Sequence, residues 1–313
     1  MKALDLSRTF FKQTALPALQ RDFPEAVLRI AAGLVGNGSE CFGFDDELSK
    51  DHDWGIDFYI WILEKDRNSL LEPLSAWKEE ILRGISSELC RAKSDYGSKA
   101  SVMSIGDFYG SLIGVPQCPE TLNEWHLPPE ENFAMAVNGE VFYDPIGDFS
   151  TIRKALLAYY PEDLRLKRMA SACMLIAQTG QYNFTRTVKR KDWVTVNHIR
   201  SAFSDHVSSL VFLLNRVYKP YYKWSWRKMQ ELPVLGSEIA ENLRTLALSY
   251  DFTEESLQSQ HKLIGVICSR LSEELLRQGL SDSKDWFLTS QGEQIQHNIK
   301  DDFLRMMPPQ FYY

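Results

Sequence analysis

Segments with strand character occur only in the first half of the 313-residue chain, and this division constrains the fold more than any other feature. Residues 53–63, "DWGIDFYIWIL", are rich in aromatic and β-branched side chains and predict a buried strand, and residues 100–106 predict a second one. Residues 150–218 instead carry apolar side chains at helical spacing almost throughout. We therefore predict an α+β chain, with strands and helices over residues 1–147 and an all-helical domain over residues 148–313.

Further elements follow from local patterns. Apolar spacing predicts helices over residues 1–20, 68–93, 237–249 and 253–278, and residues 25–36 are expected to run from a helix into a short buried strand. The Asn138-Gly139 pair predicts a hairpin over residues 134–145, because it readily supplies the two positive φ angles of a type I′ turn. The C-terminal "MMPPQFYY" is expected to be irregular.

Composition is that of an ordinary globular protein, with 44% hydrophobic and 25% charged residues. We find no apolar run long enough to span a membrane and no apolar core of a signal peptide. The 5 cysteines are scattered and lack the C-x-x-C spacing of a zinc site. These observations predict a cytoplasmic protein that is not inserted in a membrane.

Charge is distributed unevenly along the chain. The segment from Glu40 to Asp57 is strongly acidic, whereas the segment from Arg186 to Lys228 is strongly basic. An acidic and a basic pole are what a metal–polyphosphate site needs, because cations bind carboxylates and phosphates bind Lys and Arg. The alternative is a pair of solvated faces that never meet.

Two carboxylates of the acidic segment are separated by one residue. Asp51 and Asp53 are predicted at the start of a strand, where side chains alternate between faces, so both carboxylates should point the same way. Their mutual repulsion is relieved when a cation shares the site. Oxygen ligands at this spacing favour Mg²⁺, which takes its remaining ligands from water and substrate phosphates. Two exposed acids at a strand edge are the alternative.

Gly38-Ser39 follows the apolar "AAGLV" and precedes Asp51 by about a dozen residues. A strand that ends in Gly-Ser leaves backbone amides and a hydroxyl that a phosphate can approach closely. The order of strand, Gly-Ser and Asp-x-Asp resembles the nucleotidyltransferase superfamily of DNA polymerase β, whose members carry hG[GS] followed by Dh[DE]h.

Within that superfamily, the chain looks most like an uncharacterised bacterial group (DUF4037-like). The shared segments read "GSE…GFDDE.S.DHDWG", "GEVFYDP.G" and "NR.Y.PY.KW", and they lie at residues 38–55, 139–147 and 215–224. This resemblance covers roughly residues 25–235. It implies a small mixed-sheet nucleotidyltransferase domain before the helical domain.

The resemblance also implies roles for individual residues. It makes Asp51 and Asp53 the metal ligands, and it makes Gly38 and Ser39 the cradle for the triphosphate, with Ser49 helping to hold phosphate. The superfamily usually adds a third carboxylate on a later strand, as general base or extra ligand. In "SVMSIGD" the acid within reach is Asp107, and Asp57 is the alternative.

Other motifs for nucleotide or metal binding do not match this sequence. The His52-Asp53 pair lacks the upstream histidine of an HD-type phosphohydrolase, since His52 is the first histidine of the chain. Cys41 stands where a dinucleotide fingerprint needs its third glycine, and no P-loop sequence occurs.

In the basic segment, Lys223 lies in an aromatic stretch, "NRVYKPYYKWSWRK". A lysine at a helix end can reach the β- and γ-phosphates of a nucleotide, and the resemblance favours Lys223 for this role over Arg153. The alternative is an aromatic core corner whose lysines extend to water. The basic run over residues 186–191 is short and favours a solvated loop, and the acidic remainder of the chain argues against duplex DNA as a partner.

Two hypotheses of function follow. The first is a Mg²⁺-dependent nucleotidyltransferase that moves NMP from an NTP to a hydroxyl of an acceptor, which can be a small molecule, a protein or an RNA. The second is a catalytically weak nucleotide-binding regulatory or interaction protein on the same fold, which the missing obvious third carboxylate suggests.

Overall fold

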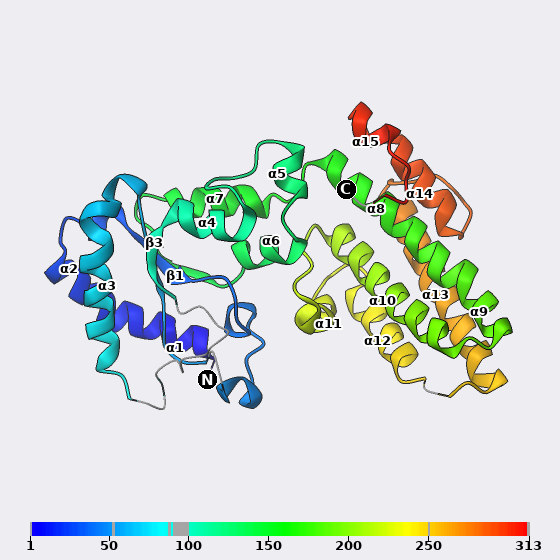
Figure 1. Ribbon diagram of the computed structural model, residues 1–313, viewed down its shortest axis with the longest axis horizontal. Coiled ribbons are helices and arrows are strands. Elements are labelled where there is room, and N and C mark those ends of the chain that lie inside the picture. The colour runs from blue at the N-terminus through cyan, green and yellow to red at the C-terminus, as the bar shows by residue number, and fades with distance from the viewer. Residues whose placement is uncertain (1, 52–53, 87–88, 90–99, 250, 312–313) are drawn as a thin grey trace. The chain divides into compact units, whose positions relative to one another are not determined.

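The computed structural model describes residues 2–51, 54–86, 89, 100–249 and 251–311. The chain forms two compact units, Met1–Tyr159 and Tyr160–Tyr313. The first unit contains a small sheet and helices, and the second consists of helices in its described part (Figure 1). The α+β prediction is therefore confirmed. The helix α7 (Asp148–Leu157), which the sequence analysis placed with the helical domain, lies in the first unit.

The sheet of the first unit has four strands in the order β3-β2-β1-β4. They are β1 (Ala31–Leu34), β2 (Tyr59–Ile62), β3 (Val102–Ser104) and β4 (Glu140–Tyr143). Strand β1 runs antiparallel to both β2 and β4, whereas β2 and β3 are parallel. The sheet is therefore mixed, and the C-terminal end of β1 lies at the edge where β2 begins.

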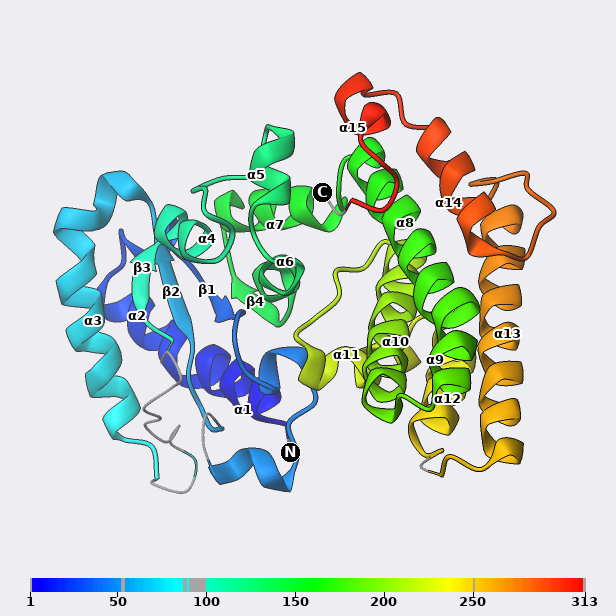
Figure 2. The ribbon, with the colours of Figure 1, turned by 45° about the vertical axis from the view of Figure 1, so that its right-hand side comes forward.

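Helices cover both faces of this sheet (Figure 2). One face packs against α1 (Ala3–Phe10), the π-helical turn Phe11–Ala15, α2 (Leu16–Asp22) and α3 (Arg67–Arg83), around the buried side chains of Phe58, Ile60 and Ile62. The alternate residues of β2 point to the other face, as strand geometry requires. There Trp61 stacks on Phe149 of α7 with ring centroids 3.8 Å apart.

The second layer of helices in the first unit follows β3 directly. It comprises α4 (Ile105–Ile113), α5 (Leu122–His126), α6 (Glu130–Val137) and α7. The side chain of Ser104 starts α4 by accepting a hydrogen bond of 2.9 Å from the amide of Asp107. Short 3₁₀ turns lie at Val27–Arg29, Glu40–Phe42, Glu47–Asp51 and Glu64–Asp66.

The predicted hairpin over residues 134–145 is wrong. Its first half is the C-terminal part of α6, and β4 pairs with β1. Asn138 has φ −78°, so the two positive φ angles of a type I′ turn are not present, although Gly139 does have φ +58°. Phe133, Ala134 and Ala136 are buried as part of helix α6. Their burial determines the backbone conformation before Asn138 and overrides the local preference for a turn.

The strands are shorter than the sequence predicts. Strand β2 covers Tyr59–Ile62 of the predicted range 53–63, whose first residue lies outside the described part of the chain, and β3 gives way to α4 at Ile105. Helix α3 ends at Arg83, while the predicted helix extends to residue 93, partly beyond the described residues. The predicted N-terminal helix is confirmed, with a π-helical turn between its two α-helical parts.

In the second unit, α8 (Glu162–Ile176) is buried along most of its length. It packs against α10 (Trp193–Asn215), α14 (Leu288–His297) and α15 (Asp302–Met306). The unit also contains a π-helical stretch at Ala177–Asn183, α9 (Phe184–Arg190), α11 (Tyr222–Gln230), α12 (Gly236–Ala247) and α13 (Glu254–Arg277). The predicted helices over residues 237–249 and 253–278 are confirmed, whereas α14 and α15 were not predicted.

Candidate functional site

The loop that follows β1 carries the Gly-Ser pair singled out from the sequence. Gly36 and Gly38 have φ of +118° and +119°, a region that L side chains rarely adopt. Because β1 and β2 are antiparallel, this loop lies at the edge of the sheet from which β2 starts. The topology therefore brings the Gly36–Ser39 loop and the segment leading into β2 to one edge.

Asn138 fixes the start of this loop. Its side-chain Oδ1 accepts a hydrogen bond of 2.8 Å from the Gly36 amide, and its Nδ2 donates one of 2.7 Å to the Gly36 carbonyl oxygen. The neighbouring Gly139 donates its amide to the carbonyl of Cys41 at 2.8 Å. A Cβ on Gly139 would overlap the carbonyl of Leu34, so only glycine permits this approach. The Asn-Gly pair thus braces the loop instead of forming a turn.

Ser39 presents polar groups that the described residues do not use. Neither its amide N–H nor its hydroxyl has a hydrogen-bond partner in the described part of the chain, and the residue is half-buried. The carboxylate of the buried Glu40 lies directly against the Cα of Gly38, where a Cβ would collide with it. The loop therefore combines a serine with two hydrogen-bond donors that the described residues do not use and a glycine whose missing side chain leaves room for the Glu40 carboxylate.

The two predicted metal ligands lie largely outside the described residues. The backbone of Asp51 ends the 3₁₀ turn Glu47–Asp51, and nothing is described of its side chain, of His52 or of Asp53. Ser49 lies in the same turn, and its hydroxyl accepts a hydrogen bond of 3.1 Å from the amide of Asp46. Among the described residues, no group of three or more His, Cys, Asp or Glu side chains is arranged to hold a metal ion.

Other residues of the acidic segment have structural roles. Asp45 is buried, and its Oδ2 accepts hydrogen bonds from the Ala3 amide at 2.9 Å and from Trp54 Nε1 at 3.1 Å. Asp45 therefore ties the start of α1 to the segment that leads into β2. A pocket of about 480 Å³ lies beside this contact, lined by Lys2, Leu6, Asp45, Asp46, Glu47, Trp54 and Leu89.

Asp57, the alternative third carboxylate, is buried and fully engaged. Its Oδ1 lies 2.6 Å from Nζ of the buried Lys78 in α3 and accepts the Phe58 amide at 2.9 Å. Its Oδ2 accepts the amide of Ala100 at 3.1 Å, just before β3. This carboxylate holds the starts of β2 and β3 together, which leaves it without a free oxygen for general-base chemistry.

Asp107, the first-choice third carboxylate, lies at the opposite edge of the sheet. Strands β2 and β3 are parallel, with Ile62 paired to Ser104, so the end of β3 lies at the edge away from the Gly36–Ser39 loop. Asp107 follows that end in the first turn of α4, and Arg67 lies 2.6 Å from its Oδ2. The structure does not bring Asp107 to the Gly-Ser loop.

The two basic residues considered for phosphate binding, Arg153 and Lys223, lie in different units. Arg153 of α7 donates from one guanidinium nitrogen to the carbonyl oxygens of Val137, Asn138 and Gly139, at 2.7 to 3.1 Å. Burial lowers the pKa of this guanidinium, and its contacts secure the end of α6. Lys223 belongs to the second unit, in the first turn of α11, with its Nζ 5.0 Å from the centre of the Trp224 ring.

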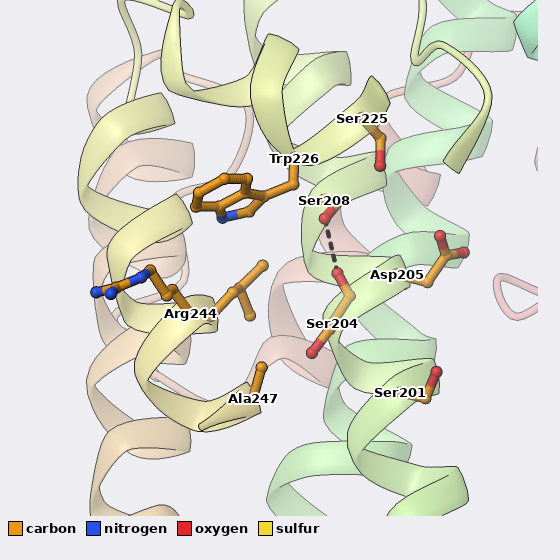
Figure 3. A pocket seen from close by; sticks show the side chains of 9 residues that line it. Ser201, Ser204, Asp205, Ser208, Ser225, Trp226, Arg244 and Ala247 are labelled. Carbon is orange, nitrogen blue, oxygen red and sulfur yellow. Dashed lines mark hydrogen bonds between the residues drawn. The ribbon is translucent and has the colours of Figure 1, made fainter. Parts of the chain in front are cut away.

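A pocket of about 480 Å³ lies between α10, α11 and α12 (Figure 3). Serines of α10 line one wall, opposite Trp226 and Arg244. The hydroxyls of Ser204 and Ser208 are bonded to carbonyls one turn earlier in α10, at 2.9 and 2.8 Å, and Trp226 Nε1 donates to the carbonyl of Ala240. These polar groups are satisfied within the unit.

The described geometry defines an α+β chain with a braced Gly-Ser loop at one edge of a four-stranded mixed sheet. Residues 125–225 match a protein family described as a domain of unknown function (DUF4037). The match includes Asn138-Gly139 and Lys223 and does not include residues 36–57. No curated protein matches the chain. Among the described residues, no helix has the length and apolar character needed to cross a membrane.

Proposed function

We propose that the first unit binds a magnesium–NTP complex at the Gly36–Ser39 edge and transfers NMP to an acceptor hydroxyl, with release of pyrophosphate. One observation carries this proposal. The antiparallel pairing of β1 and β2 puts the Gly-Ser loop at the edge from which β2 starts, and the Asp51–Asp53 segment leads into that strand. A metal–triphosphate site requires two parts, a loop that donates hydrogen bonds to the phosphates and a pair of carboxylates that bind the metal.

The loop offers the contacts that a triphosphate needs. The amide and hydroxyl of Ser39 are hydrogen-bond donors without partners in the described part of the chain. Asn138 holds the loop in place through both backbone groups of Gly36, so the donors are positioned before the ligand binds.

Asp51 and Asp53 would hold the magnesium ion, because carboxylate oxygens are the ligands that Mg²⁺ takes from proteins. When bound, the ion would supply positive charge to the triphosphate. In the transfer, the acceptor oxygen forms a bond to the α-phosphorus while the bond from that phosphorus to the pyrophosphate oxygen breaks. The acceptor hydroxyl gives its proton to water in this step, and the acceptor can be a small molecule, a protein or an RNA.

The test is a calorimetric titration with ATP, GTP, CTP and UTP, with and without Mg²⁺. We expect magnesium-dependent binding of at least one nucleotide, lost in the double variant Asp51→Asn/Asp53→Asn. Asp107→Asn is the matched control, because it removes a carboxylate of the same unit at the opposite edge of the sheet. Unchanged binding in the double variant would overturn the site. Lys223→Ala, titrated alongside, tests the lysine predicted from the sequence.

A second candidate function is nucleotide binding without turnover, as in a regulatory or interaction protein. It is favoured by the engagement of Asp57 with Lys78 and by the distant position of Asp107, which leave neither acid available as a general base at the loop. Both functions require magnesium-dependent NTP binding. Release of pyrophosphate in the presence of an acceptor distinguishes the transferase from the binding protein.

A further inference from the structure

The second unit contains a pocket of about 780 Å³ between α9 and α13, which lie side by side (Figures 1 and 2). This is the size range of pockets that enclose small organic molecules. Its lining residues are Phe184, Thr185, Val188, Lys189, Lys191, Trp193, Phe252, Glu254, Leu257, Gln258, His261 and Lys262. The basic run that the sequence analysis assigned to a solvated loop therefore borders a pocket.

Aromatic rings form much of the apolar wall. Trp193 and Phe252 stack with ring centroids 4.8 Å apart and an interplanar angle of 28°. Phe184 and Leu257 also line the pocket and are buried, so this part of the lining is closely packed. A flat ring surface of this kind suits a planar ring, which gains contact area against it without losing much conformational freedom.

The charged groups at the pocket are mostly cationic. Lys189, Lys191 and Lys262 line it and are exposed, and none of them forms an ion pair within the part of the chain that the structure describes. Glu254 is the one carboxylate among the described residues of the lining. The nearby carboxylates of Asp192 and Asp251 accept hydrogen bonds from Thr195 and Thr253 at the starts of α10 and α13.

We propose that this pocket binds a small aromatic organic anion, with its rings against Trp193 and Phe252 and its carboxylate, sulfonate or phosphate among the three lysines. An apolar wall beside unpaired cations selects for a ligand that is both flat and negatively charged. Binding here involves only groups of the second unit. It needs no magnesium and is independent of the nucleotide site proposed for the first unit.

The probe is anilinonaphthalene sulfonate, whose fluorescence rises in apolar surroundings, titrated into the full-length protein without divalent metal. We expect saturable binding of one probe per chain. N-phenylnaphthylamine, the same ring system without the sulfonate, should bind about tenfold more weakly, because it cannot interact with the lysines. Affinity for the sulfonate should also fall as salt is added, since these charges are exposed.

Variants locate the site. Lys189→Glu/Lys262→Glu should weaken sulfonate binding about tenfold or more and leave N-phenylnaphthylamine binding unchanged. Lys284→Glu/Lys300→Glu is the matched control, which changes two exposed lysines of the same unit that do not line the pocket. Trp193→Ala should weaken both probes. Circular dichroism verifies that each variant is folded.

Three results would overturn the proposal. The first is the absence of saturable binding of the sulfonate to the unmodified chain. The second is an equal effect of the control and of Lys189→Glu/Lys262→Glu. The third is equal affinity of the neutral and the anionic probe. If Asp51→Asn/Asp53→Asn abolished magnesium-free sulfonate binding, the ligand would be occupying the first unit, which also contradicts this assignment.

Discussion

Replacing Asn138 with alanine should destabilise the first unit strongly, because this one side chain satisfies two backbone groups of a buried glycine. The amide and the carbonyl of Gly36 each lose a hydrogen bond, of 2.8 and 2.7 Å. A buried polar group left without a partner costs about 1–3 kcal/mol. Two such groups therefore predict a loss of about 2–6 kcal/mol in the free energy of unfolding.

Urea denaturation followed by circular dichroism measures this loss. With a urea dependence of about 1–3 kcal/mol per molar, a loss of about 3 kcal/mol lowers the transition midpoint of the first unit by about 1–3 M. Asn132→Ala is the matched control, since it removes one amide hydrogen bond, to the carbonyl of Leu112, from the same unit. A loss below about 1 kcal/mol for Asn138→Ala, or one no larger than that of the control, would refute the bracing role.

Three further predictions concern buried charges. Asp57→Asn should lower the free energy of unfolding by about 3–5 kcal/mol, because Lys78 would remain buried without its carboxylate partner. The double variant Asp57→Asn/Lys78→Met should lose less stability than the sum of the losses of the two single variants. Additive losses would contradict the pairing. Burial lowers the pKa of Lys167 to about 8, so the unfolded chain binds more protons and stability should rise between about pH 8 and 10.5, by at most about 3 kcal/mol. This rise is measured as the difference from Lys167→Met, and an identical pH dependence of the two proteins would refute it.

The sequence predicts most of the helices of the second unit, because helical periodicity is a local property. The predicted helix over residues 253–278 matches α13 (Glu254–Arg277) to within one residue at each end, and Thr253 caps its start through the Ser256 amide. The two short helices α14 and α15 were missed. They depend on a distant partner, since both pack against α8, where Lys167 donates a hydrogen bond of 3.2 Å to Gln296 of α14.

The first unit shows where local patterns fail. Asn138-Gly139 has the composition of a hairpin turn, yet its side chain and backbone bind segments about 100 residues earlier in the chain. Asp57 has the appearance of a candidate catalytic acid, yet Lys78 and Ala100 occupy its oxygens. Neither contact has a signal in the sequence, because each depends on which strands become neighbours in the sheet.

Strand order also decides where a general base for the proposed transfer can come from. The start of β3, not its end, lies at the edge of the Gly36–Ser39 loop, and the residues described there are Ala100 and Ser101, neither of which is an acid. Asp107→Asn should then leave nucleotidyl transfer within about twofold, and it should cost about 0–1 kcal/mol of stability through the exposed pair with Arg67. The sequence pattern alone predicts the opposite, a loss of about 10²–10⁴-fold in kcat. Measured pyrophosphate release by this one variant separates the two predictions, and a loss of that size would mean that the sheet topology does not define the catalytic edge.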